Sequence, residues 1–177
     1  MTARRSAALL AATALAAALT ACAPASTPTP SPTPTGFASE AEAFAAAEAT
    51  YRAYVDALNQ VDLSDPATFE PVYALTTGEA NATERKGLSE YHANGWRVSG
   101  ETVVTLLQGS SWDPEERQVV LDSCIDVSRV DVVDRDGVSQ VSPDRPDEQT
   151  LRVTLSNPEG ADFKIAKIDS RDGGPAC

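Results

Sequence analysis

Apolar side chains between residues 40 and 60 recur every three or four positions, which is the spacing of a helix that buries one face. These positions are Phe44, Ala47, Tyr51, Tyr54, Val55 and Leu58. Ser39, followed three residues later by Glu42, forms a capping box, in which two side chains satisfy free N–H groups at the start of a helix. The pattern therefore predicts a long amphipathic helix from Glu40 to Gln60.

A second, shorter helix is expected to begin near Pro66. Ser64 or Asp65 precedes this proline, and proline suits the first helical turn because the N–H that it lacks would have no partner there. Pro71 keeps the helix short or kinked, because a proline removes a backbone hydrogen bond. The apolar face of this segment consists of Phe69, Val72, Tyr73 and Leu75.

A third helix is predicted from Glu79 or Asn81 to Ala93. Asn94-Gly95 follows it, and glycine readily takes the left-handed conformation in which many helices end. Alanine is frequent up to Ala93 and then absent until Ala161, while valine and threonine become frequent. Helices are therefore expected in the first half of the domain and strands in the second.

From Trp96 onward the apolar positions alternate with polar ones, which is the period of a half-buried strand. The expected strands cover residues 97–108, 117–127, 130–133, 138–141, 151–155 and 163–168. Turns are expected at residues 112–115, 134–137 and 157–160, where the second contains an Asp-Gly hairpin signal. Three helices followed by four to six antiparallel strands predict an α+β domain, with the helices packed on one face of a curved sheet.

The segment from Arg117 to Val127 separates its two faces most clearly. Val119, Leu121, Ile125 and Val127 share one face, and Asp122, Cys124 and Asp126 share the other. Paired carboxylates are typical of acid–base catalysis, but Asp122 and Asp126 would be about 13 Å apart on a strand, too far to act on one bond. We therefore expect both on a solvated outer face.

This order of elements resembles the NTF2-like (SnoaL-like) cone fold, and in particular small actinobacterial lipoproteins that carry it. The resemblance rests on residues 51–58, the Gly95-Trp96 junction, the run 124–128 and the turn 134–137. The resemblance implies a cone-shaped domain. Some family members are dehydratases, isomerases or cyclases, and these place Asp, His or Tyr side chains inside the cone. The sole histidine, His92, departs from that pattern because it lies at a polar helix end.

Five aromatic residues are candidates for lining such a cone, because an aromatic body with a polar tip suits a small ligand. They are Tyr51, Tyr54, Tyr73, Trp96 and Trp112. Aromatic residues at helical spacing also build ordinary cores, and this alternative stays open. The sequence indicates no catalytic set, no metal site and no cofactor.

The first 36 residues indicate an export signal and a tether. Arg4 and Arg5 precede an apolar stretch from Ala7 to Leu19 that is too short to span a bilayer. It ends in Leu19-Thr20-Ala21-Cys22, which resembles the bacterial lipobox. Residues 1–21 are thus predicted to be a lipoprotein signal peptide. Cys22 is predicted to carry fatty acyl chains, including palmitate, which anchor the protein in membrane lipid on the extracytoplasmic face. An ordinary signal peptide cleaved at Ala-x-Ala is the alternative.

Residues 22–36 follow as a Pro/Ser/Thr-rich linker, and residues 37–177 form the domain. If Cys22 is acylated, two cysteines remain, Cys124 and Cys177, and an even pair in an oxidising compartment predicts a disulfide. A catalytic Cys124 is the competing interpretation, but no histidine or cationic group lies nearby in sequence to lower its pKa.

The charge balance excludes one class of partner. The 177 residues contain 14 Lys and Arg against 26 Asp and Glu, a net charge of -12, and nucleic-acid binding needs clustered positive charge.

Arginine outnumbers lysine and alanine is abundant, which suggests a GC-rich, actinobacterial genome. The leading hypothesis is a non-catalytic envelope lipoprotein that binds an unknown envelope protein, either as a monomer or as a homodimer. The alternatives are a small-molecule binder or sensor and an NTF2-like enzyme.

Overall fold

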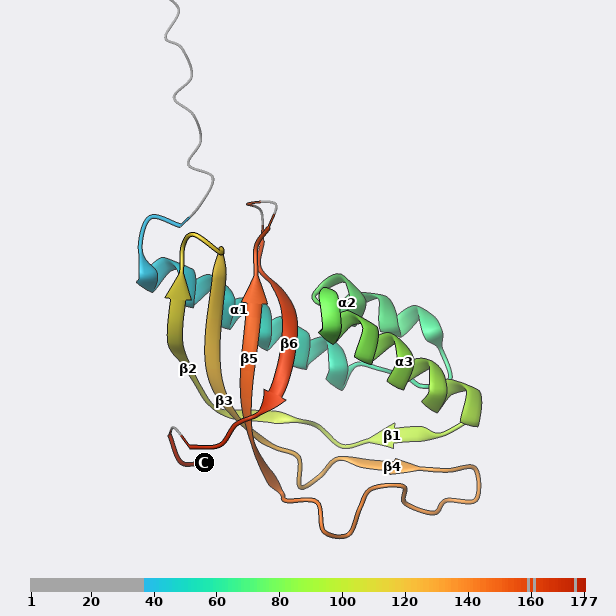
Figure 1. Ribbon diagram of the computed structural model, residues 1–177. Helices are drawn as coiled ribbons and strands as arrows, with labels where there is room; N and C mark the ends of the chain where they lie inside the picture. Colours follow the sequence, from blue (N-terminus) through green and yellow to red (C-terminus); the bar gives the residue numbers. More distant parts are fainter. Residues whose placement is uncertain (1–36, 159, 161, 174) are drawn as a thin grey trace, which may run out of the picture. The chain divides into compact units, whose positions relative to one another are not determined.

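The computed structural model describes residues 37–158, 160, 162–173 and 175–177. Three helices precede six antiparallel strands, within the range that the sequence predicts; the first helix crosses one face of the main sheet, and the second and third lie beside its last strand (Figure 1). The predicted signal peptide, Cys22 and the linker up to residue 36 lie outside the described residues. Within the described part of the chain, no helix combines the length and the apolar character needed to cross a membrane.

The first helix, α1, spans Glu40–Asn59, one residue short of its predicted end. Ser39 Oγ accepts a hydrogen bond from Glu42 N at 3.2 Å, as a capping box requires. The Glu42 carboxylate reaches one residue further back than the usual pattern and accepts from Ala38 N at 2.9 Å. Both start signals of α1 are thus confirmed.

The second helical segment begins as a 3-10 turn, η1, over Pro66–Phe69 and continues as α2 over Glu70–Ala74. Asp65 is its N-cap, and the side chain accepts from Ala67 N at 3.0 Å. Pro71 lies in the first turn of α2, where the absence of its N–H is tolerated.

The third helix, α3, spans Gly78–Asn94 and ends at Gly95, whose φ of 68° is left-handed as predicted. Gly95 N donates to His92 O and Trp96 N donates to Tyr91 O. These two bonds satisfy carbonyls that would otherwise be free at the helix end.

The strands form two sheets. The four-stranded sheet has the order β2-β3-β5-β6, and the two-stranded sheet pairs β1 with β4. Their bounds are β1 Arg97–Ser99, β2 Val103–Asp113, β3 Gln118–Asp126, β4 Asp131–Val133, β5 Glu148–Ser156 and β6 Lys164–Ser170.

Three strand predictions need correction. Residues 97–108 are not one strand, because the chain turns at Gly100 and β2 begins only at Val103. The turn predicted at 112–115 starts later, since Trp112 and Asp113 still pair with Val119 and Gln118. The segment 138–141 is not a strand, because its pairing with β4 is limited to the bridge between Ser139 and Val133 and a bond from Gln140 N to Val132 O, and Val141 N donates to Ser139 Oγ within its own segment.

The joint between the two sheets explains the break at Gly100. Gly100 has a φ of 81°, and a Cβ there would overlap the carbonyl oxygen of Arg129 on the neighbouring chain segment. The same joint is held from the other side by Arg145, whose guanidinium donates to Val127 O at 2.7 Å and Val130 O at 2.8 Å. A residue without a side chain is therefore required where the chain leaves one sheet for the other.

The core lies between the helices and the inner face of the four-stranded sheet. Its fully buried members come from helices and strands alike: Ala43, Ala47, Val72, Val119, Leu121, Val153, Leu155 and Ile165. Phe44 packs where β2 has Gly109, whose missing Cβ leaves room for the ring. The alternation predicted for residues 117–127 thus sets the inner face of β3 against α1.

Candidate functional site in the cone interior

A chain of polar side chains crosses the otherwise apolar space between the helices and the sheet. It begins on β3 with Ser123, whose hydroxyl donates to Tyr51 Oη of α1 at 3.3 Å. The rings of Tyr51 and Tyr54 lie one helical turn apart, with their centroids 6.1 Å from each other. Tyr54 Oη then donates to Glu84 Oε1 of α3 at 2.6 Å. Three elements that are distant in sequence therefore contribute one row of polar groups.

The environment favours the neutral forms of these groups. Burial raises the pKa of the Glu84 carboxyl, and the hydrogen bond from Tyr54 offsets part of that rise. Burial, followed by the charge of Glu84, raises the pKa of the Tyr54 phenol above its ordinary range. Burial also raises the pKa of Tyr51, against a smaller lowering by the bond from Ser123.

The row is closed to solvent at its centre. Tyr51 is 1% exposed, Tyr54 is 4% exposed and Ser123 is fully buried. Each hydroxyl is engaged with a neighbour in the same row. The arrangement can hold a proton between a carboxyl and a phenol, but the hydroxyls of Tyr51 and Tyr54 are directed at their partners Ser123 and Glu84.

The five aromatic candidates for a cone lining are not gathered in one place. Tyr51 and Tyr54 lie together in the row just described. Tyr73 is buried beside Phe69, and the guanidinium of Arg85 lies 4.0 Å from the centre of its ring. Trp96 stacks on Tyr91 after α3, at 5.1 Å between centroids, and Trp112 packs against the core from the end of β2.

His92 is placed in the last turn of α3, as the sequence predicts. Its Nδ1 lies 2.7 Å from Leu63 O, and its ring meets the ring of Phe69 edge-on at 6.3 Å. This histidine ties the helix end to the loop after α1. Across the described residues, no three His, Cys, Asp or Glu side chains converge in a way that could hold a metal ion.

The outer face of β3 contradicts one expectation. Asp122 is buried rather than solvated, with 5% of its surface exposed. Its carboxylate lies 3.4 Å from Arg152 Nε and 3.8 Å from Nε of Arg171, whose side chain has no exposed surface. The physical reason is that the C-terminal segment returns across this face. Asp126 is less covered, and its carboxylate accepts from Ser128 N at 2.8 Å.

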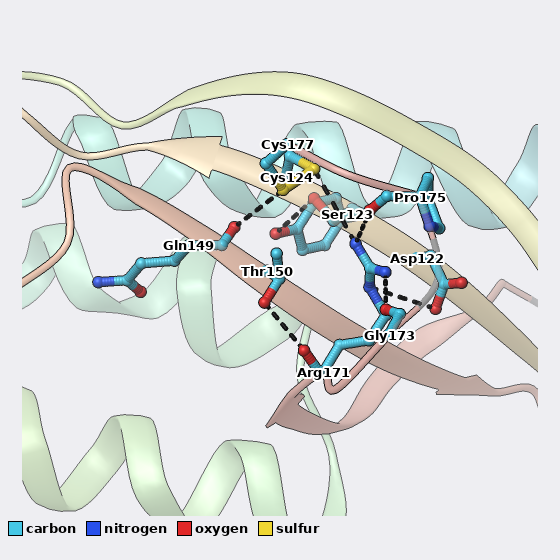
Figure 2. Close-up of a disulfide and its surroundings, with 10 residues drawn as sticks. Asp122, Ser123, Cys124, Gln149, Thr150, Arg171, Gly173, Pro175 and Cys177 are labelled. Carbon is cyan, nitrogen blue, oxygen red and sulfur yellow. Dashed lines mark hydrogen bonds and ion pairs between the residues drawn. A yellow bond between two sulfur atoms is a disulfide. The ribbon is translucent and has the colours of Figure 1, made fainter.

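Arg171 organises that returning segment, as Figure 2 shows. Its backbone pairs with Thr150, and its guanidinium donates to the carbonyl oxygens of Gly173 and Pro175. The predicted disulfide between Cys124 and Cys177 is present, with 5.6 Å between the two Cα atoms (Figure 2). The tail that begins at Arg171 is therefore fixed by ionic, hydrogen-bonded and covalent links.

A separate hollow opens at the surface between α1 and the start of β2. It has a volume of about 230 Å³ and is lined by Arg52, Val55 and Asp56 of α1 together with Thr102, Val103 and Val104. Asn59 holds the two walls in place, because its side chain donates to Thr102 O and accepts from Thr102 N, both at 2.9 Å.

Comparison with known proteins defines the fold. No protein-family model matches the sequence, and no curated protein matches it. The intermembrane space region of the chloroplast protein ARC6 is similar in structure, with 12% identity, a TM-score of 0.52 and coverage of 72% of this chain and 95% of its own. A "putative aromatic ring hydroxylase" from Novosphingobium aromaticivorans is also similar in structure, with 13% identity, a TM-score of 0.51 and coverage of 73% of this chain and 88% of its own.

The domain has the NTF2-like cone fold. At 12% and 13% identity the likeness to these neighbours establishes the fold alone. The polar row described above lies inside the cone, between its helices and the concave side of its sheet.

Two important residues were not singled out from the sequence. Glu84 lies midway between Ala80 and Leu88, the buried residues of α3, at the four-residue spacing that places all three on one helix face. That spacing predicts that the Glu84 carboxyl points toward the core. Arg171 has no such signal, because its partners Asp122 and Thr150 come from two strands far away in sequence.

Proposed function

We propose that this chain is a lipid-anchored protein of the bacterial cell envelope whose cone domain is a non-catalytic binding module. The anchor is supported by the sequence, in which a basic start and an apolar stretch lead to the lipobox at Cys22. An extracytoplasmic location is also supported by the disulfide, since such bonds persist in oxidising compartments. The proposed actinobacterial source is supported by residue usage.

The closed cone interior carries the non-catalytic part of this proposal. An enzyme that used the cone would have to bring substrate to the groups that act on it. Tyr51 and Tyr54 are 1% and 4% exposed, and their hydroxyls are occupied by Ser123 and Glu84. Binding of a partner on the outside of the domain needs no access to these groups.

The anchor is tested by labelling cells that express the full chain with an alkyne analogue of palmitate. We expect label on the wild-type protein and none on Cys22→Ser. The matched control is the double variant Cys124→Ser/Cys177→Ser, which changes the other two cysteines and should keep the label. Label on Cys22→Ser would refute the anchor.

The binding module is tested by native mass spectrometry of residues 37–177, which contain the entire core and the disulfide and belong to one compact unit. We expect a bare chain, lighter by two hydrogens than its reduced form. A small molecule that stays bound in the native spectrum and dissociates on denaturation would overturn a module that binds only on the outside of the domain, and would favour the second candidate.

A small-molecule binder or an NTF2-like enzyme is the second candidate, and Glu84 favours it. Its carboxyl faces the cone interior, burial raises its pKa, and the Tyr54 hydroxyl lies 2.6 Å away. A carboxyl with a raised pKa can act as a proton donor. If a ligand is found, Glu84→Gln and Tyr54→Phe should both weaken its retention. Unchanged retention in both variants would exclude this site.

A further inference from the structure

The two edges of the four-stranded sheet are covered to different extents. Along β6, Thr77 N donates to Ile165 O at 2.8 Å and Ile165 N donates to Leu75 O at 2.9 Å, and α3 packs on the same strand. At the opposite edge, β2 pairs with β3, and within the described part of the chain no strand pairs with its other side. Figure 1 shows β2 as the outermost strand. A bare edge presents backbone donors and acceptors to a further strand.

The sequence of β2 does little to discourage such pairing. Its 11 residues contain no Lys, Arg or Pro, and no acidic residue precedes Asp113. Edge strands in natural proteins usually carry charge, and β6 does so with Lys164, Lys167 and Asp169. Register shifts at Thr105 and at Ser110 interrupt the pairing of β2 with β3, and the uninterrupted register between them covers residues 106–109, so an added strand would be short.

The hollow between α1 and β2 lies beside this part of the edge. Val55, Val103 and Val104 give it an apolar lining, and Val103 is 39% exposed. Peptides that extend a sheet gain affinity from backbone hydrogen bonds and specificity from a pocket that takes one side chain. A bare edge and a neighbouring side-chain pocket therefore occur together.

Charge indicates which peptide fits. The neutral stretch of β2 lies between Glu101, whose carboxylate lies 3.8 Å from Arg129 in an exposed pair, and three acids at the far end, Asp113, Glu115 and Glu116. A peptide with a neutral middle and basic ends complements this pattern. A second copy of the chain does not, because antiparallel pairing of two β2 strands would bring the acidic ends of one copy against those of the other.

We propose that the bare edge of β2 binds an extended peptide segment of a partner protein as an added strand. The segment has an aliphatic side chain that enters the hollow and Lys or Arg at its ends. This inference rests on the proposed function, because it identifies where the binding module acts and what chemistry it recognises.

The test is an NMR titration of ¹⁵N-labelled residues 37–177 with the peptide Lys-Lys-Val-Thr-Val-Thr-Val-Thr-Lys-Lys. We expect shift changes concentrated on residues 102–109 and on Arg52 and Asp56. A peptide with Glu in place of Lys should bind about tenfold more weakly, since it faces like charge. Equal affinity of the two peptides, changes centred on another element, or no binding would overturn the proposal. A dimer that forms without peptide and pairs through β2 would overturn the proposal in favour of a second copy of the chain.

Two variants locate the contact. Val103→Asn removes a valine from the hollow and should weaken binding about fivefold, less than the loss of a contact in an enclosed apolar pocket because Val103 is 39% exposed. Val138→Asn is the matched control, because Val138 is 58% exposed at the β4 turn and should leave binding unchanged. Thr105→Pro, at an exposed position outside the paired register, should reduce binding further by removing a backbone donor. Equal effects of Val103→Asn and Val138→Asn would refute the hollow as the side-chain pocket.

Photo-crosslinking in cells separates this inference from the proposed function. A crosslinking residue is placed at Thr105 on the β2 edge or at Glu90 on the exposed side of α3. Crosslinks from Glu90 and none from Thr105 would overturn the β2 site and leave a binding module intact. Crosslinks from neither position, together with a ligand in the native mass spectrum, would overturn both.

Discussion

Strand β3 is buried on both faces, but by different means. On the inner face, Val119 and Leu121 belong to a core shared by helices and strands. On the outer face, Asp122 and Cys124 are covered by a tail that an ion pair and a disulfide hold in place. The inner closure is distributed over many apolar contacts, whereas the outer closure depends on a few specific bonds. We therefore expect that the tail can leave the outer face without loss of the fold, whereas opening of the inner face unfolds the domain.

Removal of the disulfide should have the largest effect on the free energy of unfolding. Cys124→Ser/Cys177→Ser opens a loop whose ends are 53 residues apart, and the chain-entropy model gives about 4 kcal/mol for a loop of this size. Urea unfolding of residues 37–177 measures the loss, and far-UV circular dichroism should show that the helices and strands persist. An unchanged urea midpoint would contradict the role given to the tail.

Truncation of the inner face should come next. Leu121→Ala removes a fully buried side chain and should cost about 3 kcal/mol, in the range for a buried leucine. The matched control, Val120→Ala, acts on the half-buried outer side of the same strand and should cost about 1 kcal/mol or less. Similar losses at the two positions would show that the two faces are not closed differently.

The ion pair under the tail should give a smaller loss. Asp122→Asn leaves Arg171 buried without its carboxylate, and we expect about 2 kcal/mol, less than for an isolated buried pair because the carbonyl oxygens of Gly173 and Pro175 still accept from Arg171. Asp169→Asn disrupts a more exposed pair with Lys167 and should change stability little. Equal effects of the two substitutions on the urea midpoint would refute a special role for Asp122.

The smallest effect concerns Glu84 and depends on pH. Because its pKa is raised in the folded state, the folded protein binds more protons than the unfolded chain above the ordinary glutamate range, so stability falls as pH rises through that window. Glu84→Gln should therefore gain roughly half a kcal/mol at neutral pH, allowing for solvent screening of a half-buried group, and lose that gain near pH 4. The exposed Glu90→Gln is the control. Thermal unfolding at several pH values measures both, and identical pH profiles would contradict burial of a charged Glu84.

The elements of the fold could be predicted wherever a local pattern determines them. The helical period and the cap at Ser39 determine α1, and strict alternation determines β3. The disulfide was also accessible, because cysteine count and compartment leave one pairing if Cys22 is acylated. The shared property of these features is that each depends on neighbouring residues or on composition.

Features that depend on contacts distant in sequence could not be predicted in this way. Asp122 looks solvated in an alternating strand, and only the return of Arg171 buries it. The division of residues 97–108 depends on Arg129 lying against Gly100. The polar row inside the cone is intermediate, since the inward position of Glu84 follows from its spacing with Ala80 and Leu88, but its contact with Tyr54 does not.

The joint at Gly100 places a native fluorophore beside each sheet. Trp96 lies directly before β1, where it stacks on Tyr91, and Trp112 lies near the end of β2, so the two tryptophans of the chain report on opposite sides of the joint. Replacing one by phenylalanine leaves emission from the other. If the contact of Gly100 with Arg129 makes the two sheets one cooperative unit, both single-tryptophan proteins will lose their native emission at the same denaturant concentration.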